Sequence, residues 1–404
     1  MTLTVNPMAP EFRYDAQGLF ARLLREQPVT PLADGGVLLC RHADVSWALN
    51  SHEVRRPTEW SVNRKPEGPF RDFGRHNMIG MNPPDHTRFR QAIMPAFSRK
   101  RTDALAQFIE DTCAGLIARM RERGEGDFIS DFALPLPVTV ICHLLGIPRE
   151  EETLLHEGSA AMLAGLEIIA TPEEFARATA GATALHDYLT EVLRLRERNL
   201  GDDLLSLLLR NERDHKLSRE EIVWAAITLL MAGHETTTHL LGNGLLALMR
   251  NPESWKRLQA EPALAENAVE EFLRYDPPLY VLFRQAAQDV AVGGQPIAAG
   301  TFLMLSLAAA NRDPRHFEEP DVLDLGRANA RDNLSFAAGR HLCAGHALAR
   351  LEGRIAFRQL ADALGGVSLA ADPVPREGVM FKGYHALPVR YHWAPHGAGP
   401  GMGG

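Results

Sequence analysis

Cysteine is scarce in this sequence of 404 residues. Its four cysteines, Cys40, Cys113, Cys142 and Cys343, are far apart along the chain. They therefore form neither a disulfide framework nor the closely spaced ligand set of a zinc ribbon or an iron–sulfur cluster. Unpaired cysteines are typical of a reducing compartment, so we expect a cytoplasmic protein.

Long apolar stretches and an excess of positive charge are also missing. The longest apolar run, Ile222 to Gly233, is too short to cross a bilayer. Residues 1–10 contain no basic segment followed by an apolar one, so we expect no signal peptide. The formal net charge of −8 disfavours general binding to nucleic acid or to anionic membranes. We therefore expect a soluble protein.

The composition is that of a globular chain, and 45% of the residues are apolar, which is enough for a large core. Because no repeat or long linker is visible, we expect one domain over residues 1–404, mainly α with small β-sheets (α+β). Residues 395–404, rich in Gly and Pro, predict a flexible tail. Predicted strands are residues 36–41 and a β-meander over residues 289–307.

The most distinctive predicted element is a long central helix. Ser218 and Glu221 form a capping box at its start, and Asn251-Pro252 ends it near Arg250. A helix of this extent is roughly 48 Å long and crosses a whole domain. Residues 227–233 are apolar on every face, which predicts that this part of the helix is buried.

Cys343 precedes another predicted helix, in the segment Phe-Ala-Ala-Gly-Arg-His-Leu-Cys-Ala-Gly of residues 336–345. Free backbone amides and the helix dipole stabilise a thiolate at such a position. One alternative interpretation is a buried structural cysteine. Another is a zinc site with His341 and His346, which lacks an obvious fourth ligand.

A second polar segment, Gly233-His-Glu-Thr-Thr237, interrupts the apolar middle of the long helix. Polar residues in a buried helix conflict with local propensity, and such conflicts tend to mark functional sites. A threonine hydroxyl can bond the carbonyl one turn back and distort the helix. The alternative is a polar kink without chemistry.

Two charged groups complete the set of candidate segments. Glu271 and Arg274 are three residues apart on one predicted helix, so their side chains can meet. Asp85 is predicted to cap a helix that carries His86 and Arg90 on one face, where two cations can bind a carboxylate or phosphate. Both groups are alternatively ordinary solvated charge.

Together, in this order and spacing, these segments resemble the cytochrome P-450 superfamily over about residues 31–391. The motif Phe-x-x-Gly-x-x-x-Cys-x-Gly is highly specific, and Ala-Gly-x-Glu-Thr-Thr and Glu-x-x-Arg are specific in combination. The segment from Asn311 to Arg327 is also similar to the family's stretch before the haem loop. The resemblance implies the P-450 fold and a bacterial-type class I haem-thiolate monooxygenase that contains haem b.

The resemblance also implies a role for each candidate residue. Cys343 is the axial thiolate ligand of the haem iron, which favours O–O cleavage. Glu235 and Thr236 are the acid–alcohol pair that relays protons during dioxygen activation. The family gives His234 no role, and we expect it to face away from the iron. The partners of the haem propionates are His86, Arg90, Arg284 and His341. The structural triad is Glu271, Arg274 and Arg327.

The substrate pocket implied by the resemblance is mostly apolar, which suits an apolar or aromatic substrate of small or medium size. Its walls include parts of residues 57–81, 162–169, 279–283 and 380–381. The pocket residues singled out are Leu229, Ala232, Gly233, Leu282 and Phe381. Arg64 and Arg71 could meet a substrate carboxylate, but we expect them to be solvated because Lys65, Glu67 and Asp72 make the loop polar.

Dioxygen is the implied co-substrate, with electrons from NAD(P)H. The stretch after Cys343 is too short for a fused flavin or ferredoxin domain, so we expect a monomer served by a separate ferredoxin and ferredoxin reductase. A basic dock for the ferredoxin is predicted from Arg99, Lys100, Arg101, Arg340 and Arg350. Two alternatives use the same fold: a peroxide-driven peroxygenase and a non-enzymatic haem gas sensor or carrier. The intact Glu235–Thr236 pair disfavours both.

Overall fold

The computed structural model describes residues 3–213 and 216–394, so the predicted tail at 395–404 lies outside the described residues. The α-helices are α1 Pro10–Tyr14, α2 Ala16–Glu26, α3 His42–Asn50, α4 Thr58–Asn63, α5 Pro69–His76, α6 Asp85–Ile93, α7 Arg99–Ala104, α8 Ala106–Arg121, α9 Pro135–Leu145, α10 Glu152–Leu166, α11 Pro172–Arg196, α12 Leu204–Arg213, α13 Arg219–Arg250, α14 Pro252–Ala260, α15 Ala265–Tyr275, α16 Leu307–Ala310 and α17 His346–Ala363. The strands are β1 Val29–Pro31, β2 Val37–Leu39, β3 Val54–Arg55, β4 Glu125–Asp127, β5 Val281–Ala286, β6 Val290–Val292, β7 Gln295–Ile297, β8 Phe302–Ser306, β9 Leu364–Leu369, β10 Val374–Pro375, β11 Tyr384–Ala386 and β12 Pro388–Trp393.

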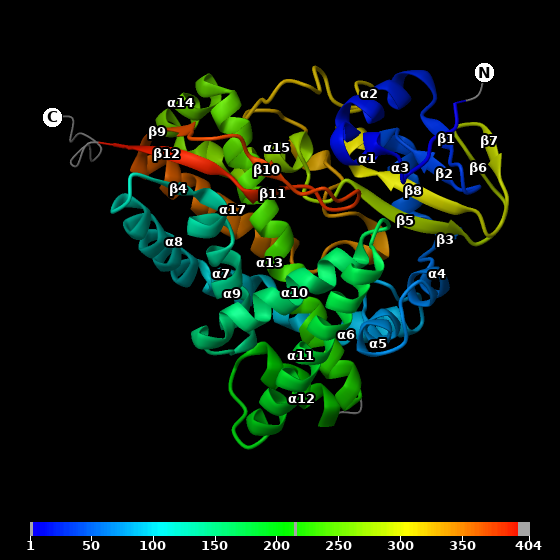
Figure 1. Ribbon diagram of the computed structural model, residues 1–404, viewed down its shortest axis with the longest axis horizontal. Helices are drawn as coiled ribbons and strands as arrows, with labels where there is room; N and C mark the ends of the chain where they lie inside the picture. The colour runs from blue at the N-terminus through cyan, green and yellow to red at the C-terminus, as the bar shows by residue number, and fades with distance from the viewer. Residues whose placement is uncertain (1–2, 214–215, 395–404) are drawn as a thin grey trace.

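Helices and the largest sheet occupy different parts of the molecule (Figure 1). The five-stranded sheet lies on the right of the view with α2 and α3, whereas α8 to α12 fill the left and the bottom. One large apolar cluster is shared by the helices, and two smaller clusters flank the sheet. The predicted α+β class, mainly helical with small sheets, is confirmed.

The largest sheet has the strand order β1-β2-β8-β5-β3, and its β2–β8 pair is parallel. The predicted strand at residues 36–41 is β2. The predicted β-meander over residues 289–307 is wrong in part. β6 and β7 form an isolated hairpin around Gly293-Gly294, whereas β8 pairs with β2 and β5. Local turn residues specify a hairpin, but they do not determine which distant strand pairs with β8.

The long helix α13 runs through the middle of the molecule (Figure 1) and has the predicted bounds. The Ser218 hydroxyl accepts a hydrogen bond from the Glu221 amide, and the Glu221 carboxylate accepts one from the Ser218 amide. Asn251 is the C-cap, and Pro252 begins α14. The 32 residues of α13 extend about 48 Å. The burial predicted for residues 227–233 is confirmed for 227–231, whereas Ala232 is exposed and Gly233 is partly exposed.

Helix α6 departs from the prediction at its start. Pro84 is the N-cap, and Asp85 lies in the first turn without a capping hydrogen bond from its side chain. The negative charge of Asp85 still interacts favourably with the positive end of the helix dipole.

Within residues 3–213 and 216–394, none of the helices is long and apolar enough to span a membrane.

A buried ion-pair network fixes the irregular chain that follows α16. Glu271 and Arg274 on α15 are both fully buried, and two hydrogen bonds of 2.7 and 2.8 Å join them. Arg327 Nε lies 3.2 Å from the same carboxylate. Arg274 also donates to the backbone carbonyls of Asn311, Pro320 and Val322. The spacing of Glu271 and Arg274 alone could not distinguish this pair from an exposed surface ion pair, whereas the structure buries both side chains completely.

We expect Arg274→Met to lower the free energy of unfolding by about 3–5 kcal/mol, because the buried Glu271 carboxylate loses its bidentate partner. The matched control is Arg194→Met. It removes the cation from the exposed Glu191–Arg194 pair, which has the same i, i+3 spacing, and should change stability little. Denaturant unfolding measures both variants. Equal losses would contradict a special role for burial.

Candidate active site

A cavity of about 330 Å³ lies beside the middle of α13. This volume is within the range of small-molecule sites. The segments predicted to form the pocket, within residues 57–81, 162–169, 279–283 and 380–381, all contribute to its wall. The residues predicted for the pocket also line the cavity: Leu229, Ala232, Gly233, Leu282 and Phe381.

The loop before α17 brings Cys343 to the cavity wall. The Cys343 amide donates to the Phe336 carbonyl at 2.9 Å, which closes the loop on itself. Gly339 has φ +64°, and a Cβ there would lie 2.6 Å from the Leu49 carbonyl oxygen. Only glycine fits this close approach between the loop and the end of α3. The side chain of Cys343 is exposed to the cavity.

The surroundings of Cys343 differ from those of the other cysteines. Burial raises the pKa of the Cys343 thiol, but the amides of Gly345 and His346 and the charges of Arg90 and Arg350 lower it. The remaining thiols are buried beside carboxylates, which raise their pKa together with burial. Burial outweighs these groups and leaves the pKa of Cys343 raised, but of the four thiols it is the one beside amides and cations that favour a thiolate.

The four predicted anion-binding residues converge on the same cavity: His86, Arg90, Arg284 and His341. The His86 and His341 rings are 4.1 Å apart. Arg56, which the sequence analysis missed, joins them. Arg56 follows the exposed Arg55 of β3. Because two successive arginines form no recognised sequence motif, only the fold reveals that Arg56 points into the cavity.

Positive charge is crowded in this part of the cavity. Burial, then the charges of Arg56 and Arg340, hold the pKa of Arg284 well below its usual range. Burial, with Arg90 and its neighbours, lowers the pKa of His86 to about 4, so His86 is neutral at pH 7 rather than cationic as predicted. Among the described residues, Arg56 Nε and Arg284 Nη2 are buried without a hydrogen-bond partner. Such donors require an anionic group of a ligand.

The polar face of α13 forms another part of the wall. Thr236 lines the cavity, and its hydroxyl donates to the Ala232 carbonyl at 3.2 Å, the bond to the carbonyl one turn back predicted for a threonine of this segment. Gly233 lies against α9, where a Cβ would be 2.8 Å from the Ile141 side chain. His234 is fully buried, bonds the Leu230 carbonyl and does not line the cavity.

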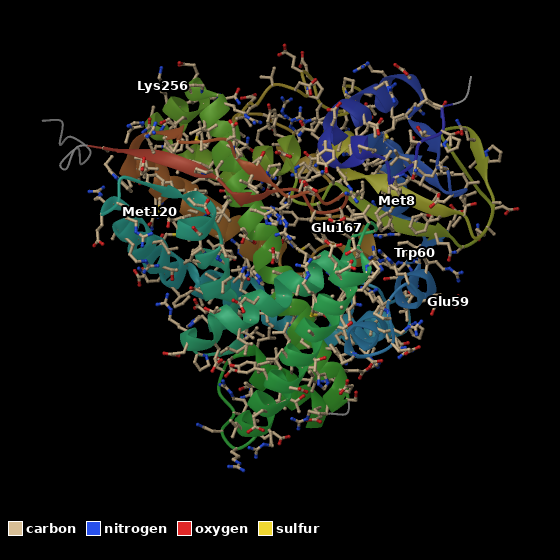
Figure 2. The ribbon with its side chains drawn as sticks, in the orientation of Figure 1. Met8, Glu59, Trp60, Met120, Glu167 and Lys256 are labelled. Carbon is tan, nitrogen blue, oxygen red and sulfur yellow. The ribbon has the colours of Figure 1, made fainter. Side chains whose placement is uncertain are left out.

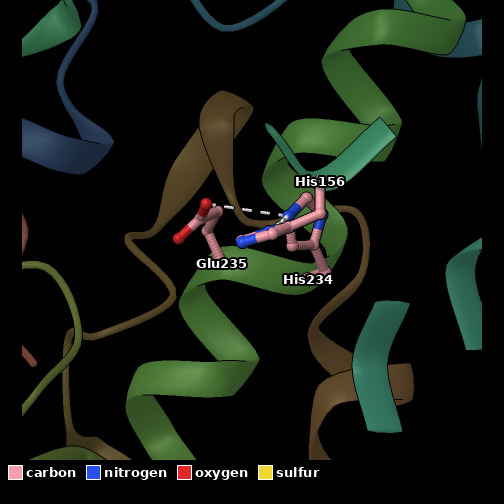
Figure 3. A group of neighbouring side chains, drawn as sticks. All are labelled: His156, His234 and Glu235. Atoms are coloured by element: carbon pink, nitrogen blue, oxygen red, sulfur yellow. Dashed lines mark hydrogen bonds and ion pairs between the residues drawn. The ribbon is translucent and has the colours of Figure 1, made fainter. Parts of the chain in front are cut away.

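Glu235 lines the cavity from a buried position and is surrounded by cationic or basic groups (Figure 3). Its Oε2 is 3.5 Å from Arg376 Nη1 and 4.0 Å from His239 Nε2. Burial acts to raise the pKa of Glu235, but His234, whose Nε2 is 3.6 Å from Oε1, together with Arg376 and His239 outweighs burial and lowers the pKa to about 2. Glu235 is therefore ionised at neutral pH.

Glu167 supports the wall near Phe381, and sequence reasoning did not find it. It follows α10 near the centre of the molecule (Figure 2). Its buried carboxylate accepts hydrogen bonds of 2.9 Å from the amides of Val379, Met380 and Phe381. No local signal in the sequence links residues 167 and 381, because the contact is made only by the fold.

The expectation that Arg64 is solvated is wrong. Its guanidinium contacts the carbonyls of Leu166 and Glu167 and lines the cavity. The adjacent Lys65 is buried, and burial, with the charge of Arg64, lowers its pKa to about 8. Arg71 pairs with Glu67 instead. Arg64 and Lys65 are therefore two further basic residues in the wall of the cavity.

The zinc alternative for Cys343 is not supported. Over the part of the chain that the structure describes, the group with metal-ligand spacing is His156, His234 and Glu235. His341 and His346 do not join Cys343 in such a group.

Comparisons with known proteins agree with this arrangement. The family profile described as cytochrome P-450 matches residues 37–361. The vitamin D(3) 25-hydroxylase of Pseudonocardia autotrophica is 38% identical over 379 residues, which cover 92% of each chain. The nocardicin C N-oxygenase of Nocardia uniformis subsp. tsuyamanensis is 34% identical over 95% of this chain and 98% of its own. The crystal structure of CalO2 superposes with a TM-score of 0.91 at 31% identity, over 97% of this chain and 99% of that one.

The family binds haem b, uses dioxygen, and receives electrons from NAD(P)H through redox partners. The residues present fit this cofactor. A cysteine faces the cavity beside cations and free amides, and buried guanidinium donors lack the anionic partners that haem propionates supply. The chain thus belongs to the cytochrome P-450 family of haem-dependent monooxygenases.

Proposed function

We propose that this protein is a haem-thiolate monooxygenase with Cys343 as the iron ligand, which inserts one oxygen atom from dioxygen into a small or medium-sized apolar or aromatic substrate. One observation carries the proposal: Cys343, the unpaired cations and the Glu235–Thr236 face all line one cavity. Bound haem activates dioxygen with electrons from redox partners. The mostly apolar lining, with Trp60, Phe73, Leu163 and Phe283 among it, supports the substrate class.

In this proposal the residues of the chain have four tasks. Cys343 would donate electron density to the iron, and backbone amides with nearby arginines partly offset the rise in its pKa that burial causes. His86, Arg90, Arg284 and His341, with Arg56, bind the haem propionates. On the α13 face of the cavity, the Thr236 hydroxyl would donate a proton, and the ionised Glu235 carboxylate would accept the next proton and pass it on. Glu271, Arg274 and Arg327 act structurally.

We also propose a cytoplasmic location, which the four free cysteines support.

Electrons are proposed to come from a separate ferredoxin and its reductase. Ion pairs within the protein engage two of the arginines predicted for the ferredoxin dock. Arg101 pairs with Asp202, and Arg350 pairs with Glu270. Arg99 and Lys100, exposed on α7 beside α17, are the stronger candidates, because their only ion pair among the described residues is the exposed contact of Arg99 with Asp103 at 3.5 Å.

The iron ligand is tested with Cys343→Ala. We expect this variant to lose the thiolate-type absorption spectrum of the reduced carbonyl complex, because alanine offers no sulfur ligand. Cys113→Ala is the matched control, since Cys113 is buried in α8 away from the cavity, and it should keep the spectrum. A thiolate-type spectrum that persists in Cys343→Ala would overturn the proposal.

The anion site is tested with Arg56→Met. Removing a charge-assisted hydrogen bond costs about 1.5–3 kcal/mol, so we expect haem to be lost at least roughly tenfold faster to a haem-scavenging protein. Arg55→Met is the control, because the exposed Arg55 bonds Gln285 and does not line the cavity. Equal haem loss from both variants would remove Arg56 from the propionate site.

Proton delivery is tested with Thr236→Val and Glu235→Gln. Positioned acid–base groups contribute about 10²–10⁴-fold, so we expect product formed per NAD(P)H to fall at least about tenfold. Thr238→Val is the control. Its hydroxyl bonds the His234 carbonyl one turn back, but it does not line the cavity. Full activity of the variants with peroxide, and no loss with dioxygen, would favour the peroxygenase alternative.

The redox dock is tested by reversing Arg99 and Lys100 to Glu. We expect slower reduction by ferredoxin and a weaker dependence of the rate on salt, because the local positive charge is removed. The control reverses Arg22 and Arg25, two exposed charges on α2, far from α7 in Figure 1. Unchanged reduction by the Arg99–Lys100 variant would exclude this dock.

A further inference from the structure

A cluster of two histidines and a carboxylate lies beside the cavity, between α10 and α13 (Figure 3). Nδ1 of His156 is 3.4 Å from Nε2 of His234, and that nitrogen is 3.6 Å from Oε1 of Glu235. All three atoms lie within 4.8 Å of one another. His156 and His234 do not line the cavity, so this group is separate from the cations that face it.

The spacing of these atoms matches a tetrahedral metal ion. Zinc binds imidazole nitrogen and carboxylate oxygen at about 2.0–2.2 Å, so its neighbouring ligand atoms are about 3.3–3.5 Å apart. Two imidazoles and one carboxylate, with a water as fourth ligand, are a common zinc set. The distances of 3.4 and 3.6 Å therefore need little adjustment.

The orientation of His234 leaves Nε2 as the nitrogen that a metal would bind. Its Nδ1 is 2.8 Å from the Leu230 carbonyl oxygen, which can only accept a hydrogen bond. A proton is therefore on Nδ1, and Nε2 is the nitrogen that faces His156 and Glu235. A carbonyl that fixes the far nitrogen in this way is the usual partner of a metal-bound histidine. His156 would bind the ion through Nδ1 as the tautomer that carries its proton on Nε2.

Glu235 supplies the observation that points independently to a ligand. The residue is 2% exposed, and its Oε1 has no hydrogen-bond partner among the described residues. A buried carboxylate oxygen without a partner is destabilising, and a cation at this point satisfies it.

The charges around the cluster indicate a reversible site. Arg376 contacts Oε2 of Glu235, and its charge opposes a divalent ion. His239 and His385 also face this group, and burial lowers the pKa of each, so both are neutral at pH 7. His156 is only partly buried, which gives an ion access from outside α10.

We propose that His156, His234 and Glu235 form a zinc site, and that zinc bound there withholds Glu235 from the cavity and inhibits turnover. The inhibition rests on the proposed function of Glu235, whereas the binding does not.

The binding test uses the purified full-length haem protein without an affinity tag, titrated with ZnCl₂ and followed by equilibrium dialysis. We expect one zinc ion per chain at this site and at least tenfold weaker binding by His156→Gln, which keeps a hydrogen bond to His234 but removes an imidazole ligand. The control is His186→Ala. His186 lies 3.2 Å from Glu220 at the surface, and its loss should leave the binding unchanged. The assignment is overturned if His186→Ala binds zinc more weakly than wild type, or if wild type and His156→Gln bind zinc with equal affinity.

A second measurement does not depend on a variant. The X-ray absorption spectrum of the zinc in the loaded wild-type protein should contain two imidazoles and an oxygen ligand at about 2.0–2.2 Å. A spectrum with sulfur ligands or with oxygen alone overturns the assignment. Zinc should also inhibit dioxygen-dependent turnover of the wild type, reversibly with a chelator, and inhibit His156→Gln at least tenfold less. If zinc binds as assigned without inhibition, the site stands and the role of Glu235 in turnover fails.

Discussion

The satisfaction of buried backbone carbonyls along the irregular chain between α16 and α17 is the constraint on which the site depends. Chain without helix or strand leaves its polar groups unpaired, and burial makes each unpaired group destabilising. Arg274 and Arg327 meet this need by donating to carbonyls at residues 311–322, while Glu271 holds both guanidiniums. Asn311 extends the network by accepting from the Leu334 amide and bonding the Ser335 hydroxyl. Cys343 is therefore held by polar contacts that begin on α15.

The arginines of the cavity differ from those of the ion-pair network. Arg274 and Arg327 pair with the Glu271 carboxylate, whereas Arg56 and Arg284 have buried guanidinium nitrogens and no carboxylate partner among the described residues. Burial lowers the pKa of Arg56 and Arg284, and the charge of Arg56 lowers that of Arg284 further. Burial, followed by the neighbouring arginine charges, also lowers the pKa of His86 and His341, so both are neutral at pH 7. In the proposed function, the propionates of haem would relieve the repulsion between these cations. Cofactor binding and folding are thereby coupled on this side of the molecule.

Much of the architecture could be predicted from the sequence, because its strongest signals are local. The capping box at Ser218 and the Asn251-Pro252 stop define α13 without reference to any other element. The helix after Cys343 follows in the same way. The partner of β8 and the inward direction of Arg56 could not be predicted, since each depends on a residue far away in sequence. The same holds for Glu167, and for His156, whose significance appears only when α10 packs on α13.

Glu167 joins the end of α10 to the turn at residues 379–381 through three successive backbone amides. A contact from a side chain to backbone is indifferent to the side chains that the turn carries. Met380 and Phe381 are thus free to change in evolution without loosening the turn that presents them to the cavity. The anchor separates the part of the wall that must stay fixed from the part that decides which molecules fit. A scaffold of this kind can acquire new substrates one residue at a time.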